Sequence, residues 1–393
     1  MLQYVLFIVL GLLAIPVSVF SLQVLLAAYY KTRLLPSTVE SMQRPSVAVI
    51  VPAHNEERGI AETLNAILPQ LNAGDQLVVV ADNCTDATAS VAKSMGAIVL
   101  ERFSETLRGK GYALDHGMRY LAPHPPEVVL IIDADCLIDA DLVSTLSKQC
   151  MQLQRPIQAN YRMTFAHATS LKQQVTELAW LVKNTVRPLG FKFLGLPCQL
   201  MGTGMAFLWT DLSACNLASG HLVEDMQLGL ELAKKGKSPV FNIDTNVSSY
   251  FPSSDEGQSS QRARWEHGHL SIILNEVPKL LNSSIKAKNK LLFAQVLDLS
   301  VPPLALLFML VVGVFAIACL DWLFFHHVIS LVMAAVLVGL LGLSIMVAWA
   351  FFGRSIMSLK QLLLAPMVIF MKIPVYIGFV VSRQVDWVRS KRD

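Results

Sequence analysis

Two aspartates, one residue apart, close the most informative stretch of the chain. Residues 128–135 read VVLIIDAD, in which five apolar residues predict a fully buried strand. Because alternate side chains of an extended backbone point the same way, Asp133 and Asp135 are expected to face one point at the carboxyl end of that strand. Two hard oxygen ligands there suit Mg²⁺ or Mn²⁺ bound to a diphosphate. The alternative is a solvated turn, in which Asp is common.

Three polar loops upstream could contribute to the same site. They read PAHNEE (residues 52–57), DNCTD (residues 82–86) and RGKG (residues 108–111). In the third, glycines would let the backbone approach an anion while Lys110 supplies a point charge, although the spacing of a Walker A loop is absent. The alternatives are helix caps for the first two loops and a solvated loop for the third.

Two carboxylates begin a helical pattern farther along the chain. Glu224 and Asp225 precede the pattern of Met226–Lys235, whose apolar residues recur at helical spacing. One interpretation is a general base that projects toward the other polar loops. The alternative is that both carboxylates only stabilise the first turn through the helix dipole.

The sequence QRARW at residues 261–265 combines an arginine fork with an aromatic ring. On a helix, Gln261, Arg264 and Trp265 fall on one face. Arginine binds phosphate in a fork geometry, and a tryptophan face stacks on a sugar or covers an apolar opening. An amphipathic helix at a membrane surface is the alternative, and the two interpretations are compatible.

A sheet with flanking helices would bring these loops together. Apolar runs alternate with helical patterns from residue 46 onward, which predicts a parallel sheet with helices on both faces. Because parallel strands end at one rim, their polar loops are expected to meet there. The predicted strands are Val47–Pro52, Leu77–Val80, Ala97–Leu100 and Val128–Ile132, and the predicted helices are Glu57–Leu68, Asp86–Ser94 and Gly111–Leu121.

The composition indicates a soluble domain held between membrane segments. Apolar residues make up 53% of the 393 residues and charged residues only 16%; ordinary globular proteins have about 25% charged residues. The excess of apolar residues lies in Leu2–Tyr29 and from Leu291 to Val381, whereas Ser46–Ser284 has an ordinary composition. The net charge of +3 does not point to a nucleic-acid partner.

The first apolar run is long enough to span a bilayer, which takes about 20 residues. Lys31 and Arg33 follow it, and basic residues beside spans favour the cytoplasmic side. Residues 1–33 are therefore predicted to form an anchor whose amino terminus lies outside. Two more spans are predicted at Leu291–Leu320 and Val328–Phe352.

The last apolar run, Leu362–Val381, is interrupted by Pro366, Lys372 and Pro374. If it crossed the membrane, the basic tail that follows it would lie outside, against the charge rule. A broken helix at the inner interface is therefore preferred. The predicted organisation is an anchor (1–33), a cytosolic domain (46–284) and a C-terminal membrane domain (291–393) with two spans and an interfacial helix.

The cysteines and Asp298 also bear on where parts of the protein lie relative to the membrane. The six cysteines show neither a CxxC pair nor zinc spacing, so they are expected to be reduced thiols of a protein that faces the cytosol. Asp298 follows an apolar start and precedes Pro302–Pro303. It is either a functional acid at membrane depth or a residue at the inner interface, and the second is preferred.

Taken in order, these motifs resemble the membrane-bound family 2 glycosyltransferases, the group of cellulose, chitin and hyaluronan synthases and ceramide glucosyltransferase. The resemblance covers about residues 46–275. It implies an α/β domain of the GT-A type that binds a nucleotide-sugar, with transmembrane helices at both ends. The motifs that carry it are VPAHNEE, ADNCTD, RGKGYAL, DAD, MGTGMAF, VED and QRARW.

The resemblance also implies roles for individual residues. Asp135 matches the metal ligand for Mg²⁺ or Mn²⁺, and Asp225 matches the general base, with Glu224 beside it. Val223 stands where many polymer synthases have Thr, which weakens the case for a processive synthase. The residues that match donor-binding positions are Pro52, His54, Glu56, Asp82, Lys110 and Asp133, and those that match the QxxRW motif near diphosphate and acceptor are Gln261, Arg264 and Trp265.

The expected function is inverting transfer of a sugar from a UDP-sugar to a membrane-associated acceptor. The membrane segments favour a lipid-linked sugar, a glycolipid or a growing polysaccharide as that acceptor, and they place the protein in contact with membrane lipid. An integral protein of a bacterial inner membrane, with its catalytic domain in the cytoplasm, is expected. The alternatives are a transporter subunit with a regulatory domain, a nucleotidyltransferase and a catalytically inactive sensor of sugar nucleotides.

Overall fold

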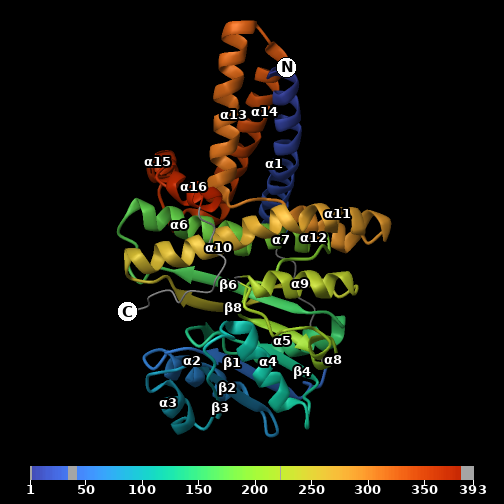
Figure 1. Ribbon diagram of the computed structural model, residues 1–393, viewed down its shortest axis with the longest axis vertical. Coiled ribbons are helices and arrows are strands. Elements are labelled where there is room, and N and C mark those ends of the chain that lie inside the picture. The colour runs from blue at the N-terminus through green and yellow to red at the C-terminus, as the bar shows by residue number, and fades with distance from the viewer. Residues whose placement is uncertain (1, 34–41, 222, 382–393) are drawn as a thin grey trace. The chain divides into compact units, whose positions relative to one another are not determined.

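A computed structural model describes the chain except for a few short segments (Figure 1). The described residues form two compact units, and neither unit is continuous in sequence. The described ranges are 2–33, 42–221 and 223–381; the sheet unit comprises 42–164 and 197–261, and the helical unit comprises 2–33, 165–196 and 262–381.

The sheet unit is built on one sheet of eight strands, in the order β3-β2-β1-β4-β7-β6-β8-β5. Strands β1 to β4 run parallel, as the sequence predicts. Strand β7 is antiparallel to both β4 and β6, so the complete sheet is mixed. The strands are β1 (Val47–Ala53), β2 (Gln76–Asp82), β3 (Ile98–Arg102), β4 (Val128–Ile131), β5 (Leu137–Ile138), β6 (Ile157–Thr164), β7 (Met205–Leu208) and β8 (Val240–Tyr250).

The expectation of an all-parallel sheet holds from β1 to β4 and fails beyond it. A strand followed by a helix that returns the chain is the signal for parallel pairing. That signal does not fix the later pairings: β7 and β5 pair antiparallel with their neighbours, whereas β6 and β8 pair in parallel. The helices of this unit are α2 (Ile60–Ile67), η1 (Leu68–Gln70), α3 (Thr88–Ser94), α4 (Lys110–Leu121), α5 (Leu142–Leu153), α8 (Trp209–Ser213) and α9 (Glu224–Lys234).

The core of the sheet unit lies between the sheet and the helices α4 and α9. Alternate residues of the central strands point into it, as the period of two in a strand requires. Strand β1 contributes Ala48 and Ile50, which are fully buried. Residues of α4 and α9 belong to the same core cluster, so packing in this core holds both helices. The other core residues from these elements are Val78, Val80, Ala113, Leu114, Met118, Leu121, Val129, Ile131, Leu228 and Leu232.

The helical unit contains the apolar helices and several shorter ones. Helix α10 (Asp255–Asn275) begins in the sheet unit and enters the helical unit at residue 262. The other elements are α1 (Leu2–Arg33), α6 (Leu171–Leu181), the π-helix η2 (Val182–Val186), α7 (Arg187–Phe193), α11 (Val277–Lys286), α12 (Lys290–Leu299), α13 (Leu304–Phe325), α14 (Val328–Ala348), the π-helix η3 (Trp349–Gly353), α15 (Leu359–Phe370) and α16 (Ile373–Val381).

Four stretches of the described chain are long and apolar enough to cross a membrane. Helices α1, α13 and α14 run side by side as a bundle. Helices α15 and α16 do not run along the upper part of this bundle (Figure 1). A break at residues 371–372 separates α15 from α16, as the predicted broken helix requires. The four stretches are Gln3–Arg33, Leu304–Phe325, Val328–Gly353 and Leu359–Phe379.

The sequence boundaries of two segments differ from the structural ones. The predicted span Leu291–Leu320 is two helices, α12 and α13, because Pro302 and Pro303 cannot donate helical hydrogen bonds and interrupt the backbone ladder. Residues 165–196 were expected within the cytosolic domain, yet their helices α6, η2 and α7 pack with the apolar helices α1 and α15. The three-domain division stays a prediction.

Candidate active site

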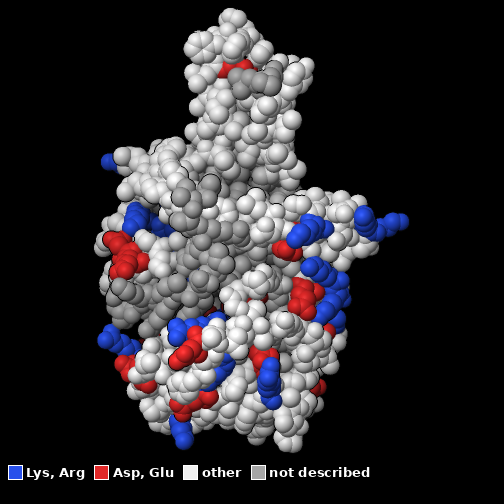
Figure 2. All heavy atoms as spheres, in the orientation of Figure 1, with Lys and Arg blue, Asp and Glu red and all other residues white. Residues whose placement is uncertain are grey.

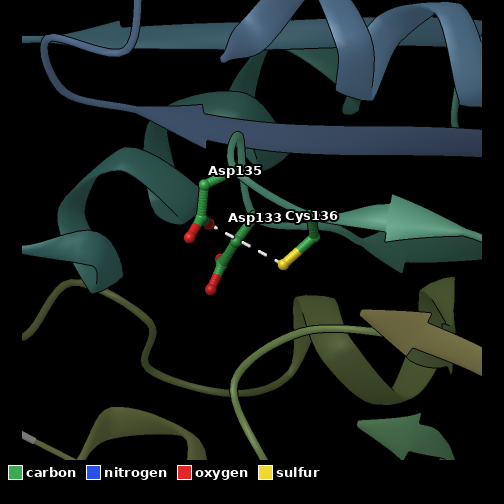
Figure 3. A group of neighbouring side chains, drawn as sticks. All are labelled: Asp133, Asp135 and Cys136. Carbon is green, nitrogen blue, oxygen red and sulfur yellow. Dashed lines mark hydrogen bonds between the residues drawn. The ribbon is translucent and has the colours of Figure 1, made fainter. Parts of the chain in front are cut away.

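The turn after β4 brings two carboxylates and a thiol together. Ligand atoms of Asp133, Asp135 and Cys136 all lie within 4.8 Å of one another (Figure 3). The strand ends at Ile131, so the carboxylates converge through a turn, closed by the bond from the Cys136 amide to the Asp133 carbonyl at 3.1 Å. The two carboxylates therefore converge, as expected. They do so through a turn and not through the alternation of side chains along an extended strand.

The chemistry of this group fits a hard divalent cation. Carboxylate oxygens are the ligands that Mg²⁺ and Mn²⁺ prefer. Burial, followed by the neighbouring Asp135 and Asp133, raises the pKa of the Cys136 thiol well above its usual value. The thiol therefore stays protonated and faces a carboxylate oxygen of Asp135 at 3.7 Å. The turn therefore offers a metal two oxygen ligands and no thiolate.

Lys110 connects this turn to a second loop. It begins helix α4, and its ammonium donates to the Asp133 carboxylate and, at 2.7 Å, to the carbonyl oxygen of Gly202. Burial would lower the pKa of Lys110, but Asp133, Glu224 and Asp225 together raise it above its usual value. Lys110 is thus a permanent cation within a group of acids.

Glu224 and Asp225 reach the same place from the first turn of α9. Burial and the adjacent Asp225 raise the pKa of Glu224 to about 7, and Lys110 opposes that rise. One oxygen of Asp225 accepts a hydrogen bond from the Met226 amide at 2.8 Å. Glu224 is therefore partly protonated near neutral pH. Asp225 accepts a hydrogen bond from an amide in the first turn of α9.

The glycine loop that precedes β7 contributes its backbone to this cluster. Gly202 has φ of +91°, a conformation that favours glycine. A Cβ at this position would lie 3.6 Å from a carboxylate oxygen of Asp225 and 3.8 Å from the ammonium of Lys110. The loop backbone thus lies against both charged groups, and Thr203 in the same loop accepts a hydrogen bond from the Asp133 amide at 3.0 Å.

The predicted nucleotide loops lie at the ends of β1 and β2. Pro52 is the second-last residue of β1. The Nδ1 atom of the His54 ring hydrogen-bonds the backbone carbonyl oxygen of Asp82 at 2.7 Å. The Asp82 carboxylate is buried and pairs with Arg102 at 2.5 Å. Arg102 was missed from the sequence, although it also ends a parallel strand and could have been found at the same sheet edge.

A pocket of about 370 Å³ adjoins the acidic turn within the sheet unit. Glu56 and Asp135 line it together, so the loop after β1 and the turn after β4 share one space. Sequence motifs did not indicate the remaining wall, which comes largely from the end of β8 and the residues after it. That wall includes Thr164, Ser248, Ser249, Tyr250, Phe251, Pro252 and Ser253.

The QRARW motif is divided between the two units. Gln261 is buried at the last position of the sheet unit, whereas Arg264 and Trp265 belong to the helical unit. There the Trp265 ring packs on Trp180 of α6, with centroids 4.9 Å apart. The three residues share helix α10, as predicted, and their placement beside the donor stays a prediction.

Comparison with known proteins identifies the family. The model of the glycosyltransferase-like family 2 matches residues 45–268. The chain belongs to this family. The match covers every motif of the site, from the loop after β1 to QRARW, and confirms the expected glycosyltransferase class.

Individual relatives match over shorter stretches. A 4,4'-diaponeurosporenoate glycosyltransferase of Staphylococcus aureus (strain USA300) is 36% identical over 106 residues, which is 26% of this chain and 28% of that protein. An uncharacterized protein, MJ1222, of Methanocaldococcus jannaschii is 33% identical over 99 residues, 25% of this chain and 39% of that protein. The chain therefore spans well under half the length of these curated relatives.

A solved structure supports the fold over nearly the whole chain. The mannosyltransferase PcManGT from Pyrobaculum calidifontis, in complex with GDP-Man and Mn²⁺, has a TM-score of 0.58 at 16% identity. The alignment covers 96% of this chain and 99% of that one. The GT-A fold with apolar helices at both ends, expected from the sequence, is confirmed.

Proposed function

We propose that the protein is a metal-dependent, inverting glycosyltransferase that moves a sugar from a nucleotide-sugar, a UDP-sugar by the sequence motifs, to a membrane-associated acceptor. The observation that carries the proposal is the convergence of Lys110, Asp133, Glu224 and Asp225 beside the pocket that Asp135 lines. This arrangement supplies a cation, a place for a divalent metal and a base within one loop cluster.

The residues of the cluster would divide the chemistry among them. Asp225 accepts the proton of the acceptor hydroxyl as that oxygen attacks the anomeric carbon, and attack opposite the leaving group inverts that centre. Lys110 stabilises the negative charge that builds on the diphosphate. A divalent cation held by Asp135 would supply further positive charge to the same leaving group.

Glu224 has a different task from Asp225. With its pKa raised to about 7, it exchanges a proton near neutral pH, whereas the Asp225 carboxylate accepts a hydrogen bond from the Met226 amide. We assign the base to Asp225 and the adjustable neighbouring charge to Glu224.

The acceptor is proposed to come from the membrane. The helical unit carries four stretches able to span a bilayer, which a soluble acceptor would not require. A lipid-linked sugar, a glycolipid or a growing polysaccharide is proposed, with the sheet unit on the cytoplasmic side of a bacterial inner membrane. Gln261, Arg264 and Trp265 are proposed to act between the donor diphosphate and this acceptor.

A donor panel with purified full-length protein tests the proposal. UDP-sugars and GDP-mannose are incubated with a lipid extract and Mn²⁺, Mg²⁺ or chelator, and nucleoside diphosphate release and product mass are measured. We expect release only with metal, together with a lipid product of increased mass. Binding of a donor without any release would favour the inactive sensor instead.

The Asp225→Asn variant tests the assignment of the base. We expect transfer to fall about 10²–10⁴-fold, since this is what general base catalysis contributes, while nucleotide binding is retained. Asp115→Asn is the matched control, because the Asp115 carboxylate pairs with an exposed arginine one turn away on α4. Unchanged turnover in Asp225→Asn would remove Asp225 from the role.

A further inference from the structure

Helix α11 and the turn that follows it carry an unusual concentration of exposed positive charge. Between Glu276 and Leu297 the chain has four lysines and, apart from Glu276, no acid. The lysines are all exposed, and the side chain of Lys279 is 73% exposed although it pairs with Glu276. Figure 2 shows blue side chains along this part of the helical unit, including its outer end. The four are Lys279, Lys286, Lys288 and Lys290.

Two large apolar side chains close to this charge in the sequence are exposed, one on α11 and one at the end of α10. Leu280 and Ser284, one turn apart, form the buried face of α11, which packs on α12. Ile285 is nevertheless 60% exposed, and Leu274 at the end of α10 is 62% exposed. Exposed lysines beside exposed apolar groups on a short helix are typical of a segment that lies in a membrane interface.

The place of α11 in the helical unit puts it near the end of the spanning helices. Helix α12 packs on α1 and is followed after residue 303 by α13. Figure 1 shows α11 and α12 lying across the foot of the bundle formed by α1, α13 and α14. The basic residues therefore lie near the ends of the spanning helices. In this region an excess of Lys and Arg marks the cytoplasmic side.

We propose that α11 and the turn to Lys290 form a contact surface for a bilayer that contains anionic phospholipids. The lysines would bind lipid phosphates, while Ile285 and Leu274 enter the boundary between head groups and acyl chains. Each basic residue near an anionic surface contributes about 1 kcal/mol, which makes a preference for anionic over neutral lipid measurable. This surface is separate from the proposed sugar transfer and does not depend on it.

Amine labelling of the full-length protein in lipid nanodiscs tests the surface. Discs of phosphatidylcholine are compared with discs that also contain phosphatidylglycerol, and the labelling rate of each lysine is read by peptide mass spectrometry. We expect about fivefold slower labelling at the four lysines in anionic discs, and recovery near 1 M salt, where the screening length is about 3 Å. Lys93, Lys234 and Lys235, exposed on the sheet unit, should not change.

Two outcomes of the labelling would overturn the proposal. One is equal labelling of the four lysines in both kinds of disc. The other is equal slowing at Lys93, Lys234 and Lys235, which would mean a general effect of the charged disc. Protection that appears only when soluble proteins are added would assign the surface to an acidic protein and would also overturn it.

Matched variants provide a second measurement. The variant K286Q/K288Q/K290Q and the control K93Q/K234Q/K235Q each remove three positive charges and bring the net charge from +3 to 0. After extraction from mixed discs, retained lipids are counted by mass spectrometry. We expect the wild type and the control to retain phosphatidylglycerol over phosphatidylcholine, and the α11 variant to lose that preference. Equal retention by the two variants contradicts the proposal.

Discussion

Lys110 is the residue that holds the loops of the site in one arrangement. Its ammonium bonds to Asp133 of one loop and Gly202 of another, and it lies in the field of both carboxylates of α9. A largely buried ammonium is stable only when acids compensate it, and the acids in turn need the ammonium. The charge balance of the site therefore depends on residues from three separate loops.

Replacing Lys110 with methionine should destabilise the protein by about 1–3 kcal/mol, less than for a fully buried pair, because half-buried carboxylates lose their cation. In a Glu224→Gln background the loss should be smaller, since one of those carboxylates is already neutral. Denaturant unfolding of the two single variants and the double variant measures this coupling. Additive effects of the two substitutions would show that Glu224 does not share the charge of Lys110.

The raised pKa of Glu224 predicts a pH dependence of stability. The folded-state pKa of about 7 lies above the usual 4.5, so the stabilising contribution is full below pH 4.5 and is lost as the pH rises through 7. Glu224→Gln should remove this decline and be the more stable protein at pH 8. Thermal unfolding at a series of pH values checks it, and parallel curves for the two proteins would contradict it.

At the scale of elements, the start of α4 and the loop that precedes α9 are set by close backbone contacts. Gly111, in the first turn of α4, faces the loop that precedes α9: a Cβ would lie 2.4 Å from the Leu217 carbonyl oxygen and 2.5 Å from that of Ser219. The absence of a side chain at Gly111 therefore lets that loop lie against the start of α4. This contact keeps the loops of Lys110 and of Glu224 together.

Gly111→Ala should destabilise the protein by about 1–3 kcal/mol, because overpacking forces the backbone to shift, and it should also weaken donor binding. Gly313→Ala is the control: its place inside helix α13, in the helical unit and not the sheet unit, and the absence of atoms within 4 Å of a Cβ there predict a neutral or slightly stabilising effect. Thermal unfolding and nucleotide binding measure both variants. Equal unfolding temperatures for the two variants would contradict the close contact.

At the scale of the whole molecule, a buried polar network ties distant segments of the helical unit. Arg187 of α7 donates to the Gln23 side chain of α1 at 2.9 Å and to the Asp298 carboxylate of α12 at 2.8 Å. Gln23 also donates to Asp298 at 2.6 Å. Asp298, which the sequence left between a functional and an interfacial role, thus has a structural ion-pair partner.

Asp298→Asn should destabilise the helical unit by about 3–5 kcal/mol, because the buried Arg187 loses its counter-charge. Thermal unfolding of the full-length protein in detergent measures the effect. Asp244→Asn, at an exposed position of the sheet unit, serves as the control and should change little. An unchanged unfolding temperature for Asp298→Asn would mean that Gln23 alone satisfies Arg187.

The sequence by itself determined the elements and the residues that end them. The parallel strands β1 to β4, the helices between them and the acidic or basic loops at their ends follow from local periodicity, which acts over a few residues. The same holds for the spanning stretches, because length and composition decide whether a helix suits a bilayer. The family motifs, read in order, pointed to the same class of enzyme.

Only the tertiary structure decided the pairings between distant segments. The antiparallel β7, the hydrogen bond of Thr203 to the Asp133 amide, the pairing of Arg102 with Asp82, and the packing of residues 165–196 with the apolar helices depend on partners far apart in the sequence. Gln23 and Asp298 are 275 positions apart, yet they share one buried hydrogen bond. Such contacts depend on which buried polar groups can satisfy one another once the chain is compact, and that choice is made across the fold rather than along it.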